Sequence, residues 1–162
     1  MLPKNGIIIT EAKVIPEWID SNQHMNVAYY FIAFEKGFDR YKDLIGMDIT
    51  YIKEQQRSTV SLEAHICYSA EATLGDMLRI ETRIAGFDKK RAHVYQEMYR
   101  NSVLLATQET LSISFDIQKR KTCDFEPQFL DHYSFLCTAQ KPHKIKGVLG
   151  RSITLPNKKS AH

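Results

Sequence analysis

Hydrophobic side chains follow a helical period in the first third of the chain. No charged residue, glycine or proline occurs from Val27 to Phe34, and charges first appear at Glu35. Asn26 stands just before this segment and Gly46 follows it, which suits an N-terminal cap and a left-handed C-terminal cap. We predict one long helix, its first two turns enclosed on all sides, from apolar residues spaced three or four apart: Val27, Tyr30, Phe31, Phe34, Phe38, Tyr41 and Ile45.

Other parts of the chain alternate between apolar and polar residues with a period of two, which is typical of β-strands. In one such run Leu62 and Ala64 fall on the predicted core side, and Glu63 and His65 fall on the other face. Short polar connections between successive runs indicate an antiparallel meander. The strands are expected at residues 7–15, 60–68, 78–84, 91–100 and 103–115, and the pattern allows a second helix at about 128–140.

These elements predict an α+β domain in which a long helix packs on an antiparallel sheet. The sheet has to wrap around the helix if the apolar N-terminal half of the helix is to be hidden from water. Periodicity does not give the order of the strands or the curvature of the sheet.

Composition supports one folded domain. The chain has 162 residues, of which 43% are hydrophobic and 25% charged, and a core of this size needs no disulfide or metal to hold it. The three cysteines form no CxxC pair, so inert thiols are expected. We predict a cytoplasmic protein, because no apolar stretch approaches the ~20 residues that cross a bilayer and the N-terminus lacks the features of a secretory signal.

Basic residues are concentrated at the C-terminal end. From residue 141 onward there are six bases and no acids, so residues 1–140 hold 16 bases and 19 acids. We therefore predict a single domain at residues 1–140 and a solvated basic tail at residues 141–162. A mildly acidic domain lacks the clustered basic face of a nucleic-acid-binding protein, and no nucleic-acid or membrane partner is expected.

The segment between the first strand and the helix carries the candidate chemistry. Asp20, Asn22 and His24 bring a carboxylate, an amide and an imidazole to the positive end of the helix. Backbone N–H groups there can hold a thioester carbonyl and its developing oxyanion, and a nearby carboxylate can activate water. Each residue taken singly also fits a capped loop, because Asp and Asn favour turns and helix starts.

One motif in this segment resembles the DxNxHxNxxY signature of hotdog-fold acyl thioesterases: Asp20, Asn22, His24, Asn26 and Tyr29. It is most similar to the acyl-carrier-protein branch, in which a Leu-Glu pair on the next strand adds a carboxylate, as Leu62 and Glu63 do here. The wider 4-hydroxybenzoyl-CoA thioesterase-like superfamily usually has glycine at the position of Gln23. Residues 24–30 and 90–93 are also similar to bacterial thioesterases of carnitine and betaine metabolism.

The resemblance implies a hotdog fold, with a five-stranded antiparallel sheet wrapped around one long central helix. It implies a thioesterase that hydrolyses an acyl-CoA or acyl-carrier-protein thioester to acid and thiol, in a homodimer or homotetramer with the acyl site between protomers. Asp20 would be the general base or nucleophile, Asn22 would orient water or the carbonyl, and His24 would polarise the carbonyl or move a proton. The helix N-terminus near Asn26 would stabilise the oxyanion, while Glu63 is either a second catalytic carboxylate or a solvated surface residue.

The function of two further groups of residues, one basic and one aromatic, has two interpretations each. Lys89, Lys90 and Arg91 form a compact basic cluster that either binds CoA phosphates or makes a solvated hairpin tip. Aromatic residues near the motif either pack in the core or line an acyl pocket, where cation–π attraction can hold a quaternary ammonium group: Trp18, Tyr29 and Tyr30.

Two other functions remain open on the same fold. One is an acyl-CoA hydratase or dehydratase, and the other is an acyl-CoA-binding module without turnover. The sequence contains no glycine-rich phosphate loop and no metal-spaced set of His and Cys residues, and no cofactor is expected because thioester hydrolysis requires none.

Overall fold

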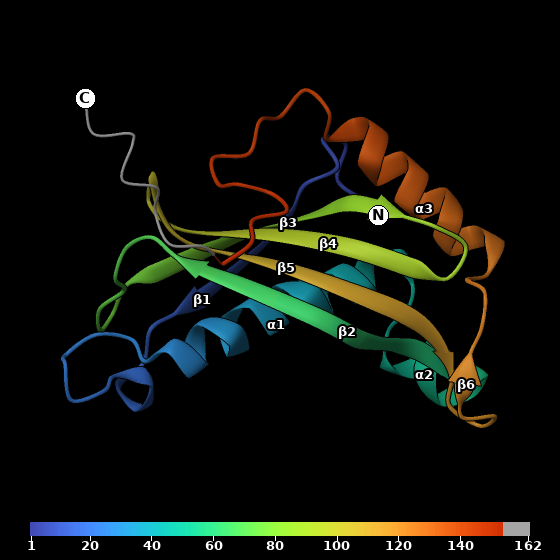
Figure 1. Cartoon of the computed structure of the whole chain (residues 1–162), viewed down its shortest axis with the longest axis horizontal. Helices are drawn as coiled ribbons and strands as arrows, with labels where there is room; N and C mark the ends of the chain where they lie inside the picture. The colour runs from blue at the N-terminus through green and yellow to red at the C-terminus, as the bar shows by residue number, and fades with distance from the viewer. Residues whose placement is uncertain (154–162) are drawn as a thin grey trace.

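The computed structural model describes residues 1–153, and its centre is a curved antiparallel sheet (Figure 1). The strand order is β1-β3-β4-β5-β2, with the short β6 paired to β5. Strands β3, β4 and β5 follow one another through short turns, as the polar connections predict. The strands are β1 (Ile8–Lys13), β2 (Arg57–Tyr68), β3 (Met77–Phe87), β4 (Arg91–Arg100), β5 (Val103–Asp116) and β6 (Lys121–Thr122).

The long helix α1 (Val27–Ile45) lies along one face of the sheet, and its predicted bounds are confirmed (Figure 1). Asn26 Oδ1 accepts a hydrogen bond from the Ala28 N–H over 3.0 Å, and Gly46 ends the helix with a φ of 86°. Gly37 lets the helix approach the sheet closely, because a Cβ there would lie 2.6 Å from Gln96 Nε2. We call the sheet face that α1 covers the inner face and the opposite one the outer face.

Three shorter helices complete the fold: η1 (Pro16–Trp18), α2 (Ile49–Gln55) and α3 (Pro127–Ala139). Helix α3 confirms the second helix that the pattern allowed. Its Tyr133 stacks near Tyr41 of α1, with ring centroids 6.2 Å apart, and so closes a second part of the core. The pattern missed α2 and β6, since seven and two residues are too few for a period to emerge.

The expectation that the start of α1 is enclosed on all sides is wrong for the single chain. Val27, Phe31 and Ile32 expose 58%, 42% and 43% of their surfaces. One face of the helix packs against the sheet, mainly β1 and β3, and the described residues leave the other face open. An apolar pattern indicates that a helix face is buried, but it does not show whether the same chain or a second chain covers that face.

The prediction that Leu62 and Ala64 face the core is also wrong. Leu62 is 54% exposed, and the pairing of β2 with β5 shifts register between Ser61 and Glu63. Such a bulge adds a residue to one strand and changes which side chains face inward. Strand β2 is an edge of the sheet, so much of its surface lacks a neighbour.

The basic C-terminal segment is attached to the sheet over part of its length. Residues 143–150, which we call the strap, cross the outer face after α3 (Figure 1). This differs from the solvated tail expected there, although the domain boundary at residue 140 stays a prediction. Lys158 and Lys159 lie outside the described residues. None of the helices described in residues 1–153 combines the length and apolar character needed to cross a bilayer.

Candidate active site

The segment from Asp20 to Asn26 forms a tight loop closed by its own main chain. The Asp20 N–H donates to the His24 carbonyl over 3.1 Å, and Asp20 Oδ1 accepts from the Asn22 N–H over 2.8 Å. Gln23 adopts a left-handed φ of 67°, a conformation that suits the glycine usual at this position in the wider superfamily. The loop thereby holds the Asp20 carboxylate beside the start of α1.

Hydrogen bonds fasten this loop and α1 to the connection that follows β2. The Met25 N–H donates to the Ala72 carbonyl over 2.8 Å. The Tyr30 hydroxyl accepts from the Ala72 N–H over 3.0 Å and donates to the Ala70 carbonyl over 3.4 Å. Burial raises the pKa of Tyr30, so this hydroxyl stays protonated and keeps both bonds.

A cavity of about 300 Å³ opens where the loop, the start of α1 and the end of β2 meet. His24 stands between two carboxylates there: its Nδ1 lies 3.9 Å from Asp20 Oδ1, and its Nε2 lies 3.8 Å from Glu71 Oε1. Both are ion-pair distances that are too long for direct hydrogen bonds. The Asp20 and His24 side chains are 23% and 31% exposed, so both can meet a substrate. Val27, the first residue of α1, also lines the cavity.

An aromatic wall faces this acid–base group. Tyr30 and Tyr68 both line the cavity, and their rings meet edge to face with centroids 5.2 Å apart. Glu71, which is 72% exposed, adds a carboxylate at the same wall. Aromatic faces together with a carboxylate form an environment that attracts an organic cation.

Besides the basic hairpin of residues 89–91, four of the predicted site residues do not line this cavity. The Asn26 side chain caps the N-terminus of α1, and Asn22 is exposed on the loop. Tyr29 stacks on Trp18, with ring centroids 5.7 Å apart. Glu63 is exposed and lines a different hollow, on the outer face of the sheet. The structure therefore brings together Asp20, His24 and Tyr30 from the predicted set, and adds Tyr68 and Glu71.

The basic hairpin tip of Lys89, Lys90 and Arg91 lies away from the cavity of the same chain. Arg91 pairs in the sheet with Ile113, far along β5 from the end where β2 reaches the cavity. Arg91 Nη2 lies 2.6 Å from Asp88 Oδ2, and Lys90 Nζ lies 3.6 Å from an oxygen of Asp124. Hydrogen bonds from the Lys90 N–H and from Arg91 lower the pKa of Asp88 to about 2, so the carboxylate offsets part of the positive charge.

Sequence reasoning missed Tyr68 and Glu71 for a physical reason. Tyr68 looks like one more apolar residue of an alternating strand, and Glu71 sits in the connection after that strand. Their nearness to Asp20 depends on the path of this connection, which no local period records. Within residues 1–153, no group of three or more His, Cys, Asp or Glu residues is placed to hold a metal ion.

A family model described as the thioesterase-like superfamily matches residues 14–132. The chain belongs to this superfamily. That match contains the loop, α1 and the four long strands β2 to β5, so it spans the elements that build the cavity.

Curated relatives point to the same class of enzyme. The chain is 34% identical over 150 residues to an L-carnitine dehydrogenase/betainyl-CoA thioesterase of Ruegeria pomeroyi, covering 92% of this chain and 31% of the relative. It thus spans about a third of that relative's length. It is 28% identical over 148 residues to a betainyl-CoA thioesterase of Pseudomonas aeruginosa, covering 90% of this chain and 93% of the relative.

Solved structures agree in fold. A hypothetical protein from Staphylococcus aureus in complex with CoA superposes with a TM-score of 0.86 at 25% identity, covering 93% of this chain and 96% of the other. A putative thioesterase from Pseudomonas putida superposes with a TM-score of 0.80 at 30% identity, covering 93% and 97%. The predicted family, hotdog fold and enzyme class, a thioester hydrolase, are confirmed.

Proposed function

We propose that this chain hydrolyses an acyl-CoA thioester, with Asp20 as the general base. The observation that carries the proposal is a partly exposed carboxylate, held by its own loop, in a cavity at the start of α1. Asp20 takes a proton from water while the water oxygen bonds to the thioester carbon. The carbon–sulfur bond then breaks, and the proton goes to the leaving thiolate.

The start of α1 supplies the oxyanion site in this mechanism. Asn26 already engages the Ala28 N–H through its side chain and the Tyr29 N–H through its carbonyl. The Val27 N–H, at the cavity wall, is the donor that we assign to the developing oxyanion, with the helix dipole behind it. Asn26 thus acts by positioning the helix start.

His24 and Asn22 have supporting roles in the proposal. His24, between Asp20 and Glu71, polarises the carbonyl or moves the proton to the thiolate. Asn22, exposed beside Asp20, orients the attacking water.

The acyl group that suits this cavity is cationic. Tyr30, Tyr68 and Glu71 line a cavity of about 300 Å³ and together favour a quaternary ammonium group. The relatives named betainyl-CoA thioesterases act on an acyl group of this kind, so we propose betainyl-CoA, with CoA as the carrier.

A second copy of the chain completes the site in this proposal. Apolar residues are exposed both on α1, at Val27, Phe31 and Ile32, and on the edge strand β2, at Val60 and Leu62. An unpaired strand edge beside exposed apolar surface is a surface that pairs with another chain. We propose a homodimer through β2 and the open face of α1, on which a tetramer can build.

This pairing would bring predicted site residues that lie away from the cavity closer to it. Val60 of β2 lies opposite Ile113 of β5, which in turn pairs with Arg91, while Tyr68 at the other end of β2 lines the cavity. Antiparallel pairing of two β2 strands therefore brings the partner's basic hairpin, Lys89 to Arg91, to the sheet end that holds Asp20. In this arrangement the hairpin can meet CoA phosphates, and Glu63, near the middle of β2, lies by the interface.

The experiment is thiol release from a panel of CoA thioesters, with betainyl-CoA compared with 3,3-dimethylbutanoyl-CoA, its neutral isostere. We expect turnover of betainyl-CoA with a kcat/KM at least about tenfold above that of the isostere. Absence of turnover on every member would contradict hydrolysis. CoA binding without turnover indicates a binding module, and water loss from a 3-hydroxyacyl-CoA without thiol release indicates a dehydratase. The cytoplasmic location stays a prediction.

A further inference from the structure

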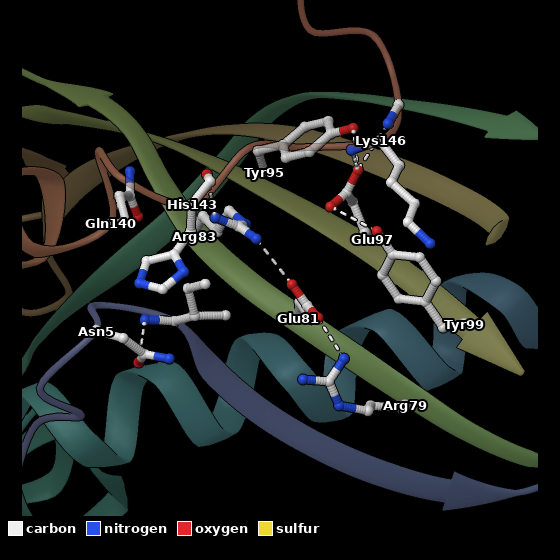
Figure 2. A network of polar contacts seen from close by, with 12 residues as sticks. Asn5, Arg79, Glu81, Arg83, Tyr95, Glu97, Tyr99, Gln140, His143 and Lys146 are labelled. Atoms are coloured by element: carbon white, nitrogen blue, oxygen red, sulfur yellow. Dashed lines mark hydrogen bonds and ion pairs between the residues drawn. The ribbon is translucent and has the colours of Figure 1, made fainter. Parts of the chain in front are cut away.

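A second hollow, of about 440 Å³, lies on the outer face of the sheet between β3, the β4–β5 turn and the strap. It shares no residue with the cavity at Asp20 and none with the basic hairpin of residues 89–91. Four basic side chains line it, together with the carboxylate of Glu81: Arg79, Arg83, Lys144 and Lys146. Figure 2 shows the polar network from which its wall is built.

Two arginines of β3 share one carboxylate at the floor of this hollow. Arg79 pairs with Oε1 of Glu81, and Arg83 Nη2 donates to Oε2 over 2.8 Å (Figure 2). Arg83 is only 5% exposed, its Nη1 donates to the His143 carbonyl over 3.0 Å, and its Nε has no hydrogen-bond partner among residues 1–153. Glu81 compensates the charge of this buried guanidinium, but a buried N–H group without an acceptor is costly, so within the described part of the chain the Nε–H of Arg83 still lacks a partner that would stabilise it.

The neighbouring carboxylate, Glu97, is fully buried and fastens the strap. Its Oε1 accepts from the N–H groups of Lys146 and Gly147, each over 2.7 Å, and its Oε2 accepts from the Tyr99 hydroxyl over 2.9 Å. Tyr95 donates to the same carboxylate over 3.3 Å. All four donors are neutral groups, so hydrogen bonds hold Glu97 in place without an ion pair.

The strap brings two lysines over the hollow. Lys146 Nζ donates to the Ser102 carbonyl over 3.0 Å and lies 5.3 Å from the centre of the Tyr99 ring. Lys144, next to His143, lines the hollow from an exposed position. Four cations against the carboxylates of Glu81 and Glu97 leave a net charge of about +2, which matches the −1.5 to −2 of a phosphate monoester.

We propose that this hollow binds a phosphate group, held by Arg79, Arg83, Lys144 and Lys146. Guanidinium and ammonium groups around a polar hollow are the donors that phosphate oxygens prefer. The phosphate is either that of the adenosine phosphate end of CoA or that of a separate phosphorylated metabolite. The site does not depend on thioester hydrolysis, and no residue of the catalytic loop belongs to it.

The test is calorimetric titration of the full chain with adenosine 3′,5′-bisphosphate and with pyrophosphate, each in the presence and absence of CoA. We expect saturable binding of at least one probe, weakened about tenfold or more in a Lys144→Gln/Lys146→Gln variant. A Lys53→Gln/Lys121→Gln variant removes the same charge from exposed positions outside the hollow and should bind as the wild type does.

Competition by CoA would assign the hollow to the nucleotide end of CoA, and binding unaffected by CoA would assign it to a separate phosphorylated ligand. Either result supports the site. Lack of saturable binding by both probes, or equal weakening in the two double variants, would overturn it. Thiol release measured in parallel separates the proposals, because a chain that binds phosphate without turnover contradicts only the hydrolysis, and turnover without phosphate binding contradicts only the hollow.

Discussion

The Gly147 N–H donates to the buried carboxylate of Glu97 over 2.7 Å, and the approach leaves no room for a side chain. A Cβ at position 147 would lie 2.4 Å from the Tyr95 hydroxyl and 2.5 Å from Thr107 Cγ2. This contact ties the strap to the sheet and sets where Lys144 and Lys146 stand.

Replacement of this glycine should release the strap. We expect Gly147→Ala to speed amide hydrogen exchange at residues 146, 147 and 150, and to lower the free energy of unfolding by about 1–3 kcal/mol. Gly86→Ala is the matched control, because a Cβ at Gly86 meets nothing within 4 Å. Unchanged exchange in Gly147→Ala would show that the strap does not depend on this contact.

Glu35 predicts a pH-dependent stability. Burial on α1, with a smaller contribution from Asp39, raises the pKa of Glu35 above its ordinary 4.5. The folded state therefore binds the proton more tightly than the unfolded state, and the stability that this gives is lost as pH rises from about 4.5 through the raised pKa.

Glu35→Gln should accordingly melt at a higher temperature than the wild type at pH 7. The difference should shrink as the pH falls below about 4.5, where both side chains are neutral. Thermal melts at the two pH values check this, and a variant that is less stable than the wild type at pH 7 would rule the explanation out.

The exposed apolar face of α1 predicts the assembly. Phe31→Lys places a charge where the second copy should pack, so we expect its sedimentation to shift from dimer or tetramer toward monomer. Phe135→Lys makes the same change at a residue of α3 that is 45% exposed and should leave the assembly intact. A wild type that sediments as a monomer, or equal effects of the two variants, would remove the proposed interface.

The proposed cation site predicts a selective loss. Glu71→Gln and Tyr68→Leu should each lower kcat/KM for betainyl-CoA by about 3- to 30-fold, since cation–π and ionic attraction to a quaternary ammonium group are lost. The same variants should barely change turnover of the neutral isostere 3,3-dimethylbutanoyl-CoA. Equal losses on both substrates would mean that these residues shape the cavity without recognising charge.

The sequence predicted most of the fold because the elements that matter are long and periodic. Helix α1 repeats its apolar pattern over about five turns and has a cap residue at each end, and β3 to β5 are separated by recognisable turns. Leu62 escaped prediction because a bulge breaks the period of β2. The attachment of the strap was not predicted because it is made by main-chain N–H groups, which leave no sequence pattern, and because lysine-rich ends are usually solvated.

The candidate site was predicted only where it is local. Asp20 and His24 belong to one loop, and Tyr30 lies in the first turn of the helix that follows this loop. The sequence alone therefore indicated that these three residues lie close together. Tyr68 and Glu71 join them through the tertiary path after β2, while Glu63 and the basic hairpin lie away from the cavity of the same chain and would approach it only in the proposed dimer. Short-range sequence patterns do not indicate the path of the chain after β2 or a contact between two chains.

The central claim is that the Asp20 carboxylate activates water. The most direct measurement is thiol release from betainyl-CoA by the Asp20→Asn variant. Glu17→Gln is the control for loss of a nearby exposed carboxylate. An amide accepts the Asn22 N–H as a carboxylate does but takes no proton from water, so kcat should fall by about 10²- to 10⁴-fold while the fold and CoA binding persist. Near-wild-type turnover by a well-folded Asp20→Asn would contradict the account.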